Sequence, residues 1–428
     1  MKYKHFKQAL LFKVGSIRKE NIINNMKVLH IQTGMTPAGN AAFRLHTAMC
    51  KAGIDSAVVT LQRTVKRNNV MNLHMKPSLM ICSVLNSLNV KRQLKYKKSG
   101  TYFYSPFPMI TSNGELKKYV ADADVIYLHW IAGGFLSCSD IENMAKTGKL
   151  LVFFMHDMWT MTGGCHHAFE CSEYYSGCNN CHMFSSKYHL AKKQSEAKWN
   201  LFHKYNNLVF VSPSKWMAEC ARNSFILKDK PIWVIPNVVD EQIFKPLDKN
   251  IAKGILNLPQ DKFIVTFGCQ AGAGNKFKGF DYLRDAINKT DLRNVQLVVY
   301  GSDYDQKTVD ELKYPVKFLG PINDEYALSL ICNATDLFVS PSLAESFGLT
   351  FLENILCDTP VIGFDCTAIP EIVQTGKTGY LAKYKDSDNL AEGIRQLFNH
   401  YIQPNWRDNY VSQDIVNMHL KLIEKYKK

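Results

Sequence analysis

Two glutamates flank a predicted helix start in the second half of the chain. Glu345 and Glu353 stand in the segment PSLAESFGLTFLENILC (341–357), where a turn at Gly348 precedes a helix expected to begin at about Leu349. A helix start presents free backbone N–H groups and the positive end of its dipole, so it favours an anion such as a phosphate. Glu353, one turn inside the helix, can accept hydrogen bonds from vicinal hydroxyls such as those of a ribose, and Glu345 can face a sugar. Taken alone, the spacing is also compatible with two surface glutamates that bind nothing.

A histidine and a glycine loop follow predicted strands in the first half. His156 directly follows the apolar run 150–155, so we expect it at the carboxyl edge of a sheet, either as a ligand-binding side chain or as a cap. Gly34 and Gly39, with Asn40, follow the first predicted strand, and glycines there let the backbone approach a ligand closely. Ligands of open α/β proteins bind at this edge of the sheet.

A cysteine-rich loop follows His156. Residues 163–182 read GGCHHAFECSEYYSGCNNCH, and their four thiols belong to Cys165, Cys171, Cys178 and Cys181, with His166, His167 and His182 alongside. Four thiols that end in a Cys-x-x-Cys pair can form a tetrahedral structural zinc site. Buried thiols that pack the loop and redox-labile disulfides are the alternatives. We expect this loop on the acceptor side of a cleft.

Short apolar runs alternate with helix-compatible segments in both halves of the chain. The runs of the first half are 27–32, 56–61, 125–129, 150–155 and 208–212, and those of the second are 263–268, 295–301, 316–320, 336–342 and 360–364. This alternation predicts parallel strands covered on both faces by helices. The expected fold is α/β, with two doubly wound Rossmann-like domains that face each other across a cleft.

The chain of 428 residues is long enough for two domains. The segment IPNVVDEQIFKP (235–246) has two prolines and no helical period, so it is the expected connection. The predicted divisions are a basic N-terminal extension, a first Rossmann-like domain, a second Rossmann-like domain and a C-terminal helix that returns to the first domain. Their ranges are 1–25, 26–235, 236–405 and 406–428.

The formal net charge is +14, from 52 Lys and Arg against 38 Asp and Glu. Such a charge favours nucleic acid, a phospholipid surface or a phosphorylated substrate. No helix-turn-helix, zinc-finger array or RNA-recognition signature is found, so we expect no nucleic-acid partner. Basic residues gather in 1–25 and among 91–98, the latter beside the aromatic residues Tyr96, Tyr102, Phe103 and Tyr104. This mixture suits an anionic membrane surface, although a solvated basic face is an equal interpretation.

The best candidate for a membrane-spanning segment, residues 70–90, is interrupted by His74, Lys76 and Pro77, so no transmembrane helix is predicted. The basic N-terminus has too short an apolar core for a secretion signal. We therefore expect a cytoplasmic chain with reduced cysteines, and peripheral attachment to the inner face of the plasma membrane is a further hypothesis.

The region around the paired glutamates resembles the signature of glycosyltransferase family 4. In that signature two glutamates bracket an FGL-type turn and precede a GTPV strand start and a PEI segment, and this chain reads ESFGLTFLE, DTPVIGF and IPEIV. Further matches in the family's order are SPSKWMAE (212–219), IPNVVDEQIF (235–244), the pair Lys278-Gly279, ATDLFVSPS (334–342) and TGKTGYLA (375–382). The resemblance is specific over residues 208–382, and KVLHIQTGMTPAGNAAFRL resembles the family's first strand and glycine loop.

The resemblance implies the GT-B fold and a retaining glycosyltransferase of the hexosyltransferase type. Its donor would be a nucleotide-diphosphate sugar, and its acceptor a saccharide or lipid-linked molecule in capsule, exopolysaccharide or O-antigen biosynthesis. By resemblance, Glu353 holds the donor ribose and Glu345 contacts the transferred sugar near its reacting carbon. Lys278 would neutralise the departing diphosphate, and His156 would contact the donor sugar. The diphosphate would bind at the turn formed by Ser346, Phe347, Gly348 and Leu349.

One position departs from the family's pattern. The family usually has an arginine just after the preceding strand, whereas Cys269 stands near that place and Lys276 is the candidate substitute. A lysine offers a point charge rather than a bidentate fork. The chain has no paired-aspartate loop of the metal-dependent type, so no cofactor is expected for catalysis and zinc would be structural. A sugar-nucleotide epimerase of similar fold and a non-enzymatic nucleic-acid or anion-binding protein are the competing functions.

Overall fold

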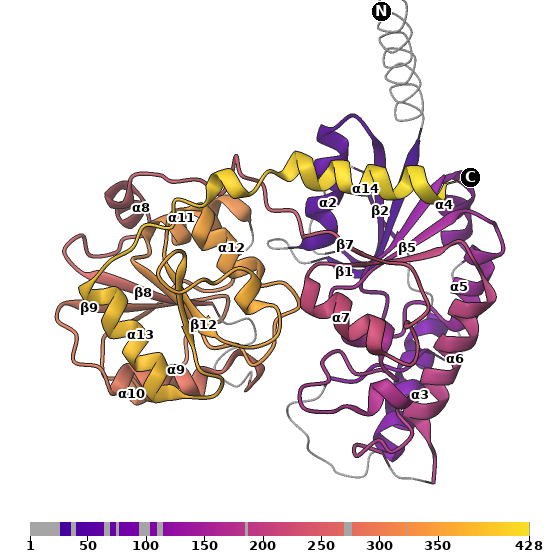
Figure 1. The fold of residues 1–428 in the computed structure, drawn as a ribbon, viewed down its shortest axis with the longest axis horizontal. Coiled ribbons are helices and arrows are strands. Elements are labelled where there is room, and N and C mark those ends of the chain that lie inside the picture. The colour runs from indigo at the N-terminus through magenta and orange to yellow at the C-terminus, as the bar shows by residue number, and fades with distance from the viewer. Residues whose placement is uncertain are drawn as a thin grey trace, which may run out of the picture.

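The computed structural model describes residues 26–35, 40–63, 69–73, 77–93, 103–108, 114–184, 187–268, 276–322 and 324–427. The N-terminal extension 1–25, Gly39, Cys269 and most of the basic cluster after Arg92 lie outside these described residues. The described chain forms two α/β domains that lie side by side, each built on its own parallel sheet (Figure 1).

The first domain is built on a sheet of seven parallel strands in the order β3-β2-β1-β4-β5-β6-β7. The strands are β1 (Lys27–Met35), β2 (Asp55–Arg63), β3 (Val70–Asn72), β4 (Val125–Leu128), β5 (Leu150–Phe154), β6 (Leu208–Ser212) and β7 (Ile232–Val234). Every residue of β4, β5 and β6 is buried, as expected for strands with helices on both faces. The strand order reverses between β1 and β4, which is where ligands of doubly wound sheets bind.

The described part of the first domain has six helices. They are α2 (Ala41–Lys51), α3 (Pro77–Gln93), α4 (Leu116–Asp122), α5 (Cys138–Ala145), α6 (Leu190–Lys204) and α7 (Lys215–Asn223). Asn40 caps α2, Ser214 caps α7, and Ser137 forms a capping box with Asp140 at α5. Two short 3-10 turns, Met158–Met161 and Glu173–Ser176, lie in or near the cysteine-rich loop. Among the described helices, none is long and apolar enough to span a membrane.

The second domain has a sheet of six parallel strands in the order β10-β9-β8-β11-β12-β13. These are β8 (Phe263–Gly268), β9 (Val295–Tyr300), β10 (Val316–Phe318), β11 (Leu337–Ser340), β12 (Val361–Phe364) and β13 (Gly379–Ala382). Its helices are α8 (Lys249–Ile255), α9 (Phe280–Asn288), α10 (Gln306–Glu311), α11 (Glu325–Ala334), α12 (Leu349–Leu356) and α13 (Ser387–Asn399), with 3-10 turns at Lys276–Lys278 and Ile369–Glu371.

The chain passes between the domains twice. The first passage follows β7, and the second leads through a 3-10 turn (Arg407–Asn409) to α14 (Ser412–Tyr426), which returns to pack along α2 (Figure 1). The Tyr410 hydroxyl joins the two passages, since it donates to the Asn237 carbonyl at 2.8 Å and accepts from the Val239 amide. One apolar core includes side chains of both sheets, of α2 and of α14. The two domains therefore share part of their hydrophobic interior.

Candidate active site

A cavity of about 270 Å³ lies between the two domains. Its walls are Gln32, Asn40, Ala41, Ala42, Trp130 and His156 from the first domain, Asn237 from the connection, and Glu345, Ser346, Phe347, Gly348 and Leu349 from the second domain. Seven residues singled out in the sequence therefore meet at one cavity: Asn40, His156 and the run Glu345 to Leu349. Gly34 lies inside β1 and is not part of the wall.

The start of α12 is one wall of this cavity. Gly348 caps the helix with a φ of 93°, a left-handed conformation that favours glycine, and a Cβ there would lie 3.0 Å from the Phe351 ring. Leu349 is the first helical residue, as the sequence predicts. The positive end of the helix dipole and the first backbone N–H groups consequently border the cavity, an arrangement that suits a phosphate.

Lys278 and Glu345 form an ion pair at the same wall. Their Nζ and Oε1 atoms are 2.8 Å apart, and their side chains are 21% and 15% exposed. Gly279, which follows Lys278, lies against the carbonyl of Pro341. Its φ is 71° and a Cβ there would lie 2.0 Å from the Pro341 carbonyl oxygen, so only glycine fits at this position. The Glu345 amide donates to the Thr367 hydroxyl at 2.9 Å, which holds the loop in place. The side chain of Lys276 lies outside the described residues.

His156 faces the second domain from the end of β5. Its carbonyl accepts a hydrogen bond from the Ser346 hydroxyl at 2.6 Å, so the two domains touch at the cavity. Its ring Nε2 lies 2.7 Å from Nδ1 of His129. Burial lowers the pKa of His156 to about 4, so its imidazole is neutral at pH 7.

The neighbouring Asp157 is engaged in holding its own loop. Its side chain accepts from the Trp159 amide at 2.8 Å and pairs with His166 at 2.6 Å. Burial alone would raise the pKa of Asp157, but the interaction with His166 outweighs burial and the pKa lies below its ordinary value. Asp157 is therefore a carboxylate that orders the segment between β5 and the cysteine-rich loop.

Glu353 lies outside the cavity wall, in an ion pair between the domains. Its Oε1 is 2.7 Å from Nη2 of Arg44, and Nε of Arg44 is 2.7 Å from Glu325. The side chains of Glu353 and Arg44 are only 1% and 2% exposed. Burial raises the pKa of Glu353 in spite of the nearby guanidinium. No local pattern in the sequence marks Arg44 as its partner, and a contact of Glu353 with a donor ribose stays a prediction.

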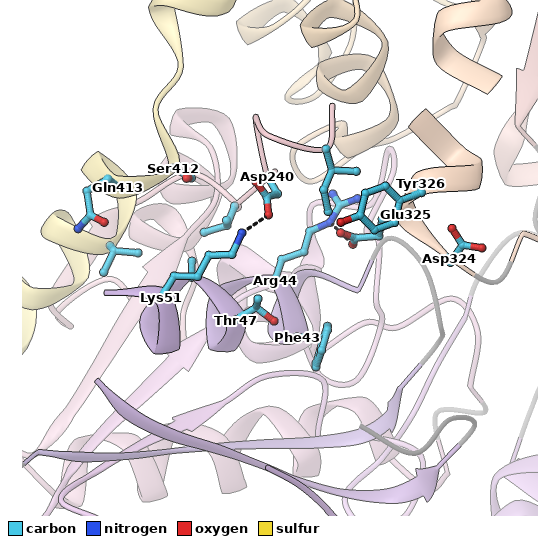
Figure 2. Close-up of a pocket in the computed structure, with 14 residues that line it drawn as sticks. Phe43, Arg44, Thr47, Lys51, Asp240, Asp324, Glu325, Tyr326, Ser412 and Gln413 are labelled. Atoms are coloured by element: carbon cyan, nitrogen blue, oxygen red, sulfur yellow. Dashed lines mark hydrogen bonds and ion pairs between the residues drawn. The ribbon is translucent and has the colours of Figure 1, made fainter. Parts of the chain in front are cut away.

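Arg44 also borders a second cavity of about 260 Å³ between α2, the first interdomain passage, α11 and α14. Figure 2 shows Arg44 reaching from α2 toward Glu325 of the other domain, and the ion pair of Lys51 with Asp240. Burial alone would lower the pKa of Arg44, but Glu353 and Glu325 outweigh it and raise that pKa. The interface on this side is thus held by charges.

Five further wall residues were not singled out in the sequence: Gln32, Ala41, Ala42, Trp130 and Asn237. Gln32 is on β1, Trp130 follows β4 by two residues, and Asn237 is in the first interdomain passage. The strand ends offered a signal for Gln32 and Trp130, because side chains at carboxyl ends of parallel strands gather at the binding edge. Asn237 lies inside the motif IPNVVDEQIF, which predicted only a connection and a family match.

The four cysteines of the loop line one small cavity of about 20 Å³, together with Tyr174, His182 and Met183 among others. All four are free thiols, and burial raises the pKa of Cys165, Cys178 and Cys181, to about 11 for Cys178. Within the described part of the chain, no three His, Cys, Asp or Glu side chains are arranged to hold a metal ion. Zinc binding by this loop therefore stays a prediction.

The cysteine-rich loop reaches the second domain. The His167 and Phe277 rings lie 4.7 Å apart between centroids, and Phe277 precedes Lys278. The exposed side chains of Glu170 and Lys385 also pair across the domains at 2.7 Å. The loop thus contacts the segment of the second domain that carries Lys278.

A protein-family model matches the second domain. Residues 264–400 match the family model described as Glycosyl transferases group 1. This group 1 match runs from β8 to the last residues of α13, so it includes Lys278, Glu345 and the start of α12. It covers the second domain only.

Curated relatives give partial matches. A D-inositol 3-phosphate glycosyltransferase of Mycolicibacterium paratuberculosis is 34% identical over 170 residues, which are 37% of this chain and 37% of the relative. An uncharacterized 41.2 kDa protein in the cps region of Klebsiella pneumoniae is 24% identical over 227 residues, 50% of this chain and 61% of that protein. The chain thus spans less than two thirds of the length of these relatives.

The whole architecture matches a solved structure. Anabaena Alr3699/HepE in complex with UDP and glucose superposes with a TM-score of 0.61 at 17% identity, and the match covers 94% of this chain and 100% of that one. The predicted fold class, GT-B with two Rossmann-like domains, is confirmed. The group 1 family model and the curated relatives thus match part of this chain, and the fold match covers nearly all of it.

Proposed function

We propose that this chain is a retaining glycosyltransferase that moves a sugar from a nucleotide-diphosphate donor to a saccharide or lipid-linked acceptor. The observation that carries the proposal is the interdomain cavity, where the start of α12 and the pair Glu345 and Lys278 face His156 of the other domain. A helix start and a fixed cation are what a departing diphosphate requires.

In this proposal each wall of the cavity has its own task. The diphosphate binds the amides at Phe347, Gly348 and Leu349, and Lys278 neutralises the charge that develops on the leaving oxygen. Glu345, freed from Lys278 by the donor, contacts the sugar close to its reacting carbon. The acceptor hydroxyl attacks on the face that the diphosphate leaves, and the leaving phosphate takes its proton. Catalysis then depends on positioning and on electrostatic stabilisation.

The nature of donor and acceptor is also a proposal. The Anabaena protein is in complex with UDP and glucose, which makes UDP-sugars the first donors to test here. The relative from the cps region of Klebsiella pneumoniae supports a role in polysaccharide biosynthesis of the capsule type. An acceptor of this kind is often attached to a lipid, so the enzyme would work at the inner face of the plasma membrane.

The surface of α3 supports contact with a membrane. Ile81, Val84, Leu85 and Leu88 are 56–61% exposed and recur at the spacing of one helix face. Residues 77–93 contain no acidic side chain, and Lys91 and Arg92 lie in the last turn. An apolar stripe beside basic residues is the pattern of a helix that lies in the surface of an anionic bilayer. This bilayer is the partner that the proposal assigns to α3.

A donor screen tests the activity. The purified chain is incubated with UDP-, GDP- and ADP-sugars, and thermal stabilisation, hydrolysis and transfer are measured. We expect one nucleotide class to stabilise the protein and to be turned over. Release of an epimerised donor without hydrolysis or transfer would instead support the epimerase, and salt-sensitive duplex binding without nucleotide-sugar binding would support the nucleic-acid alternative.

Two substitutions then test the site. Lys278→Met and Glu345→Ala each remove one member of a partly exposed pair, and we expect each to lower kcat by about 100-fold, as for loss of one group that stabilises developing charge. Glu392→Ala on α13, where Glu392 pairs with Arg395 at the surface, is the matched control. Glu353 is unsuitable for this test because its removal would leave the buried Arg44 guanidinium with Glu325 as its remaining ion-pair partner, which would change the stability of the protein. Full activity of folded Lys278→Met and Glu345→Ala proteins would refute the proposal.

A further inference from the structure

Three histidines of the first domain form a continuous hydrogen-bonded chain that ends at the candidate active site. Nδ1 of His30 lies 2.8 Å from Nε2 of His129, and Nδ1 of His129 lies 2.7 Å from Nε2 of His156. The three side chains come from β1, the end of β4 and the end of β5, which are adjacent strands in the sheet. The three hydrogen-bonded histidines therefore span three adjacent strands and end at the binding edge of the sheet.

The three histidine rings meet edge to edge and nearly in one plane, and other aromatic rings pack beside them. The centroids of His30 and His129 are 5.1 Å apart, those of His129 and His156 are 5.0 Å apart, and Phe154 stacks on His156 at 4.7 Å. Tyr127 stacks on His30 at 5.0 Å. These contacts fix which ring nitrogen of each histidine meets its neighbour.

The surroundings keep all three rings neutral. Burial lowers the pKa of His30 and His129 well below the ordinary value, and the neighbouring histidines lower it further. Asp157, next to His156, acts in the opposite direction and raises the pKa of His156, but burial outweighs it. The other ionisable groups against the three histidines are Tyr127, which packs on His30, His46 on α2, which pairs with Ser56 at 2.8 Å, and His419 on α14, which pairs with the Tyr127 hydroxyl at 3.1 Å. Among the described residues, none of these groups forms a hydrogen bond with the three histidines.

A neutral imidazole carries one N–H, and this fixes the direction of both hydrogen bonds together. If His129 donates from Nδ1 to His156, it accepts at Nε2 from Nδ1–H of His30. If it donates from Nε2 to His30, it accepts at Nδ1 from Nε2–H of His156. In the first case His156 has its proton on Nδ1, and in the second case Nδ1 of His156 carries no proton.

The buried end of the chain selects the first case. Nε2 of His30 is buried and has no hydrogen-bond partner among the described residues. In the second case this nitrogen would carry an unpaired N–H, whereas in the first it is only an unpaired acceptor. Unpaired buried N–H groups are the rarer of the two in proteins. At the other end, Nδ1 of His156 has no partner within the described chain, and His156 lines the cavity.

We propose that His30 and His129 are positioning residues that hold His156 as the Nδ1–H tautomer, a neutral hydrogen-bond donor presented to an oxygen of the ligand in the cavity. The identity of that ligand, a sugar nucleotide, rests on the proposed function. His156 then donates to a hydroxyl or phosphate oxygen without carrying a charge.

The tautomer is measured directly by NMR on the full chain labelled with ¹⁵N-histidine, with the His156 signals assigned by their loss in His156→Gln. We expect the wild-type protein to carry the His156 proton on Nδ1. His129→Phe keeps an aromatic ring at this position but removes both hydrogen bonds, so we expect His156 to shift to the Nε2–H form or to a mixture. A wild-type spectrum with the proton on Nε2 overturns the proposal, and this reading does not require the variant to fold.

His419→Phe is the matched control, because it replaces a buried histidine against the same face of the sheet without touching the chain. It should leave the His156 tautomer unchanged and the kcat/KM for the sugar nucleotide within about twofold, whereas His129→Phe should lower kcat/KM about tenfold, the effect of one hydrogen bond. An unchanged tautomer in folded His129→Phe, or equal kinetics in both variants, contradicts the proposal. If the wild-type protein turns over no sugar nucleotide yet shows the Nδ1–H tautomer, it is the proposed function that fails.

Discussion

At the scale of single residues, the first domain keeps several histidines uncharged inside its core. His30, His46, His129 and His419 are buried on the side of the sheet that α2 and α14 cover. Burial lowers the pKa of each below the ordinary value of about 6.5, to about 4 for His46 and about 3 for His419. A histidine of this kind takes up a proton when the chain unfolds at mildly acidic pH.

The free energy of unfolding should therefore fall as the pH is lowered from 7 to 5. The unfolded chain binds more protons than the folded one below about pH 6.5, and each buried histidine contributes a slope of up to about 1.4 kcal/mol per pH unit. Urea unfolding at pH 7.5, 6.5 and 5.5 measures this slope. His419→Phe should reduce it by about one proton, and equal stability of the wild-type protein at pH 7.5 and 5.5 would contradict this account.

The sequence was informative about side chains that belong to a local pattern. Glu345 to Leu349 and His156 could be singled out because a turn before a helix and the end of an apolar strand mark binding positions. The pairing of Glu353 with Arg44 was not accessible, since those residues meet only when the two domains are in place. The link of His156 to His129 and His30 likewise depends on the order of β1, β4 and β5 in the sheet.

At the scale of elements, α3 offers a membrane contact that can be removed without disturbing a core. Leu85→Glu with Leu88→Glu places two charges on its exposed stripe, and we expect cosedimentation with vesicles that contain anionic lipid to fall at least tenfold. The matched control is Ile251→Glu with Ile255→Glu on α8, where the side chains are equally exposed. Binding that is independent of anionic lipid, or lost equally in both double variants, would speak against α3 as the docking helix.

The cysteine-rich loop makes a second prediction at this scale. If zinc joins Cys165, Cys171, Cys178 and Cys181, the purified protein should contain about one zinc per chain and lose it when Cys178 and Cys181 are replaced by serine. Cys50→Ser, outside the loop, should keep the metal. Metal analysis under reducing conditions decides, and a zinc content near zero in the wild-type protein removes the zinc hypothesis in favour of packed thiols.

Continuous apolar strands were predictable, and three of the four edge strands were not. The runs that became β4, β5, β6, β8 and β9 are continuous and largely buried, so the sequence alone marks them. The edge strands β3, β7 and β13 have only three or four residues, too few for a pattern to be distinguished from a loop, whereas the edge strand β10 lies within the predicted run 316–320. Residues 77–93 were considered only as part of a membrane-spanning candidate, because serine and asparagine residues interrupt their apolar pattern.

At the scale of the whole molecule, the two domains are held together by a buried ion pair and a shared core. Arg44→Met leaves the Glu353 carboxylate buried without its partner, and we expect a loss of about 3 kcal/mol in the free energy of unfolding. Lys51→Met on the same helix removes an ion pair with Asp240 in which Lys51 is 57% exposed, so the loss should stay below about 1 kcal/mol. Denaturant unfolding compares the two, and equal small losses would show that the Arg44 pair does not stabilise the interface.

The two-domain fold followed from the sequence because each half repeats the same alternation of strands and helices. How the halves face each other did not follow from that alternation. Besides the shared core, the contacts between them include single side chains at strand ends and loop turns, such as Ser346 with the His156 carbonyl and Lys385 with Glu170. No period in the sequence marks such residues.

The two passages of the chain, joined by Tyr410, restrict how the domains can move apart. Two domains joined by two neighbouring passages can open by a hinge motion at those passages, but they resist twisting about their common long axis. Displacement would then grow with distance from the hinge, so that a nucleotide could enter by a modest opening. Each time the domains close again, the same residues of the two cavity walls would face each other.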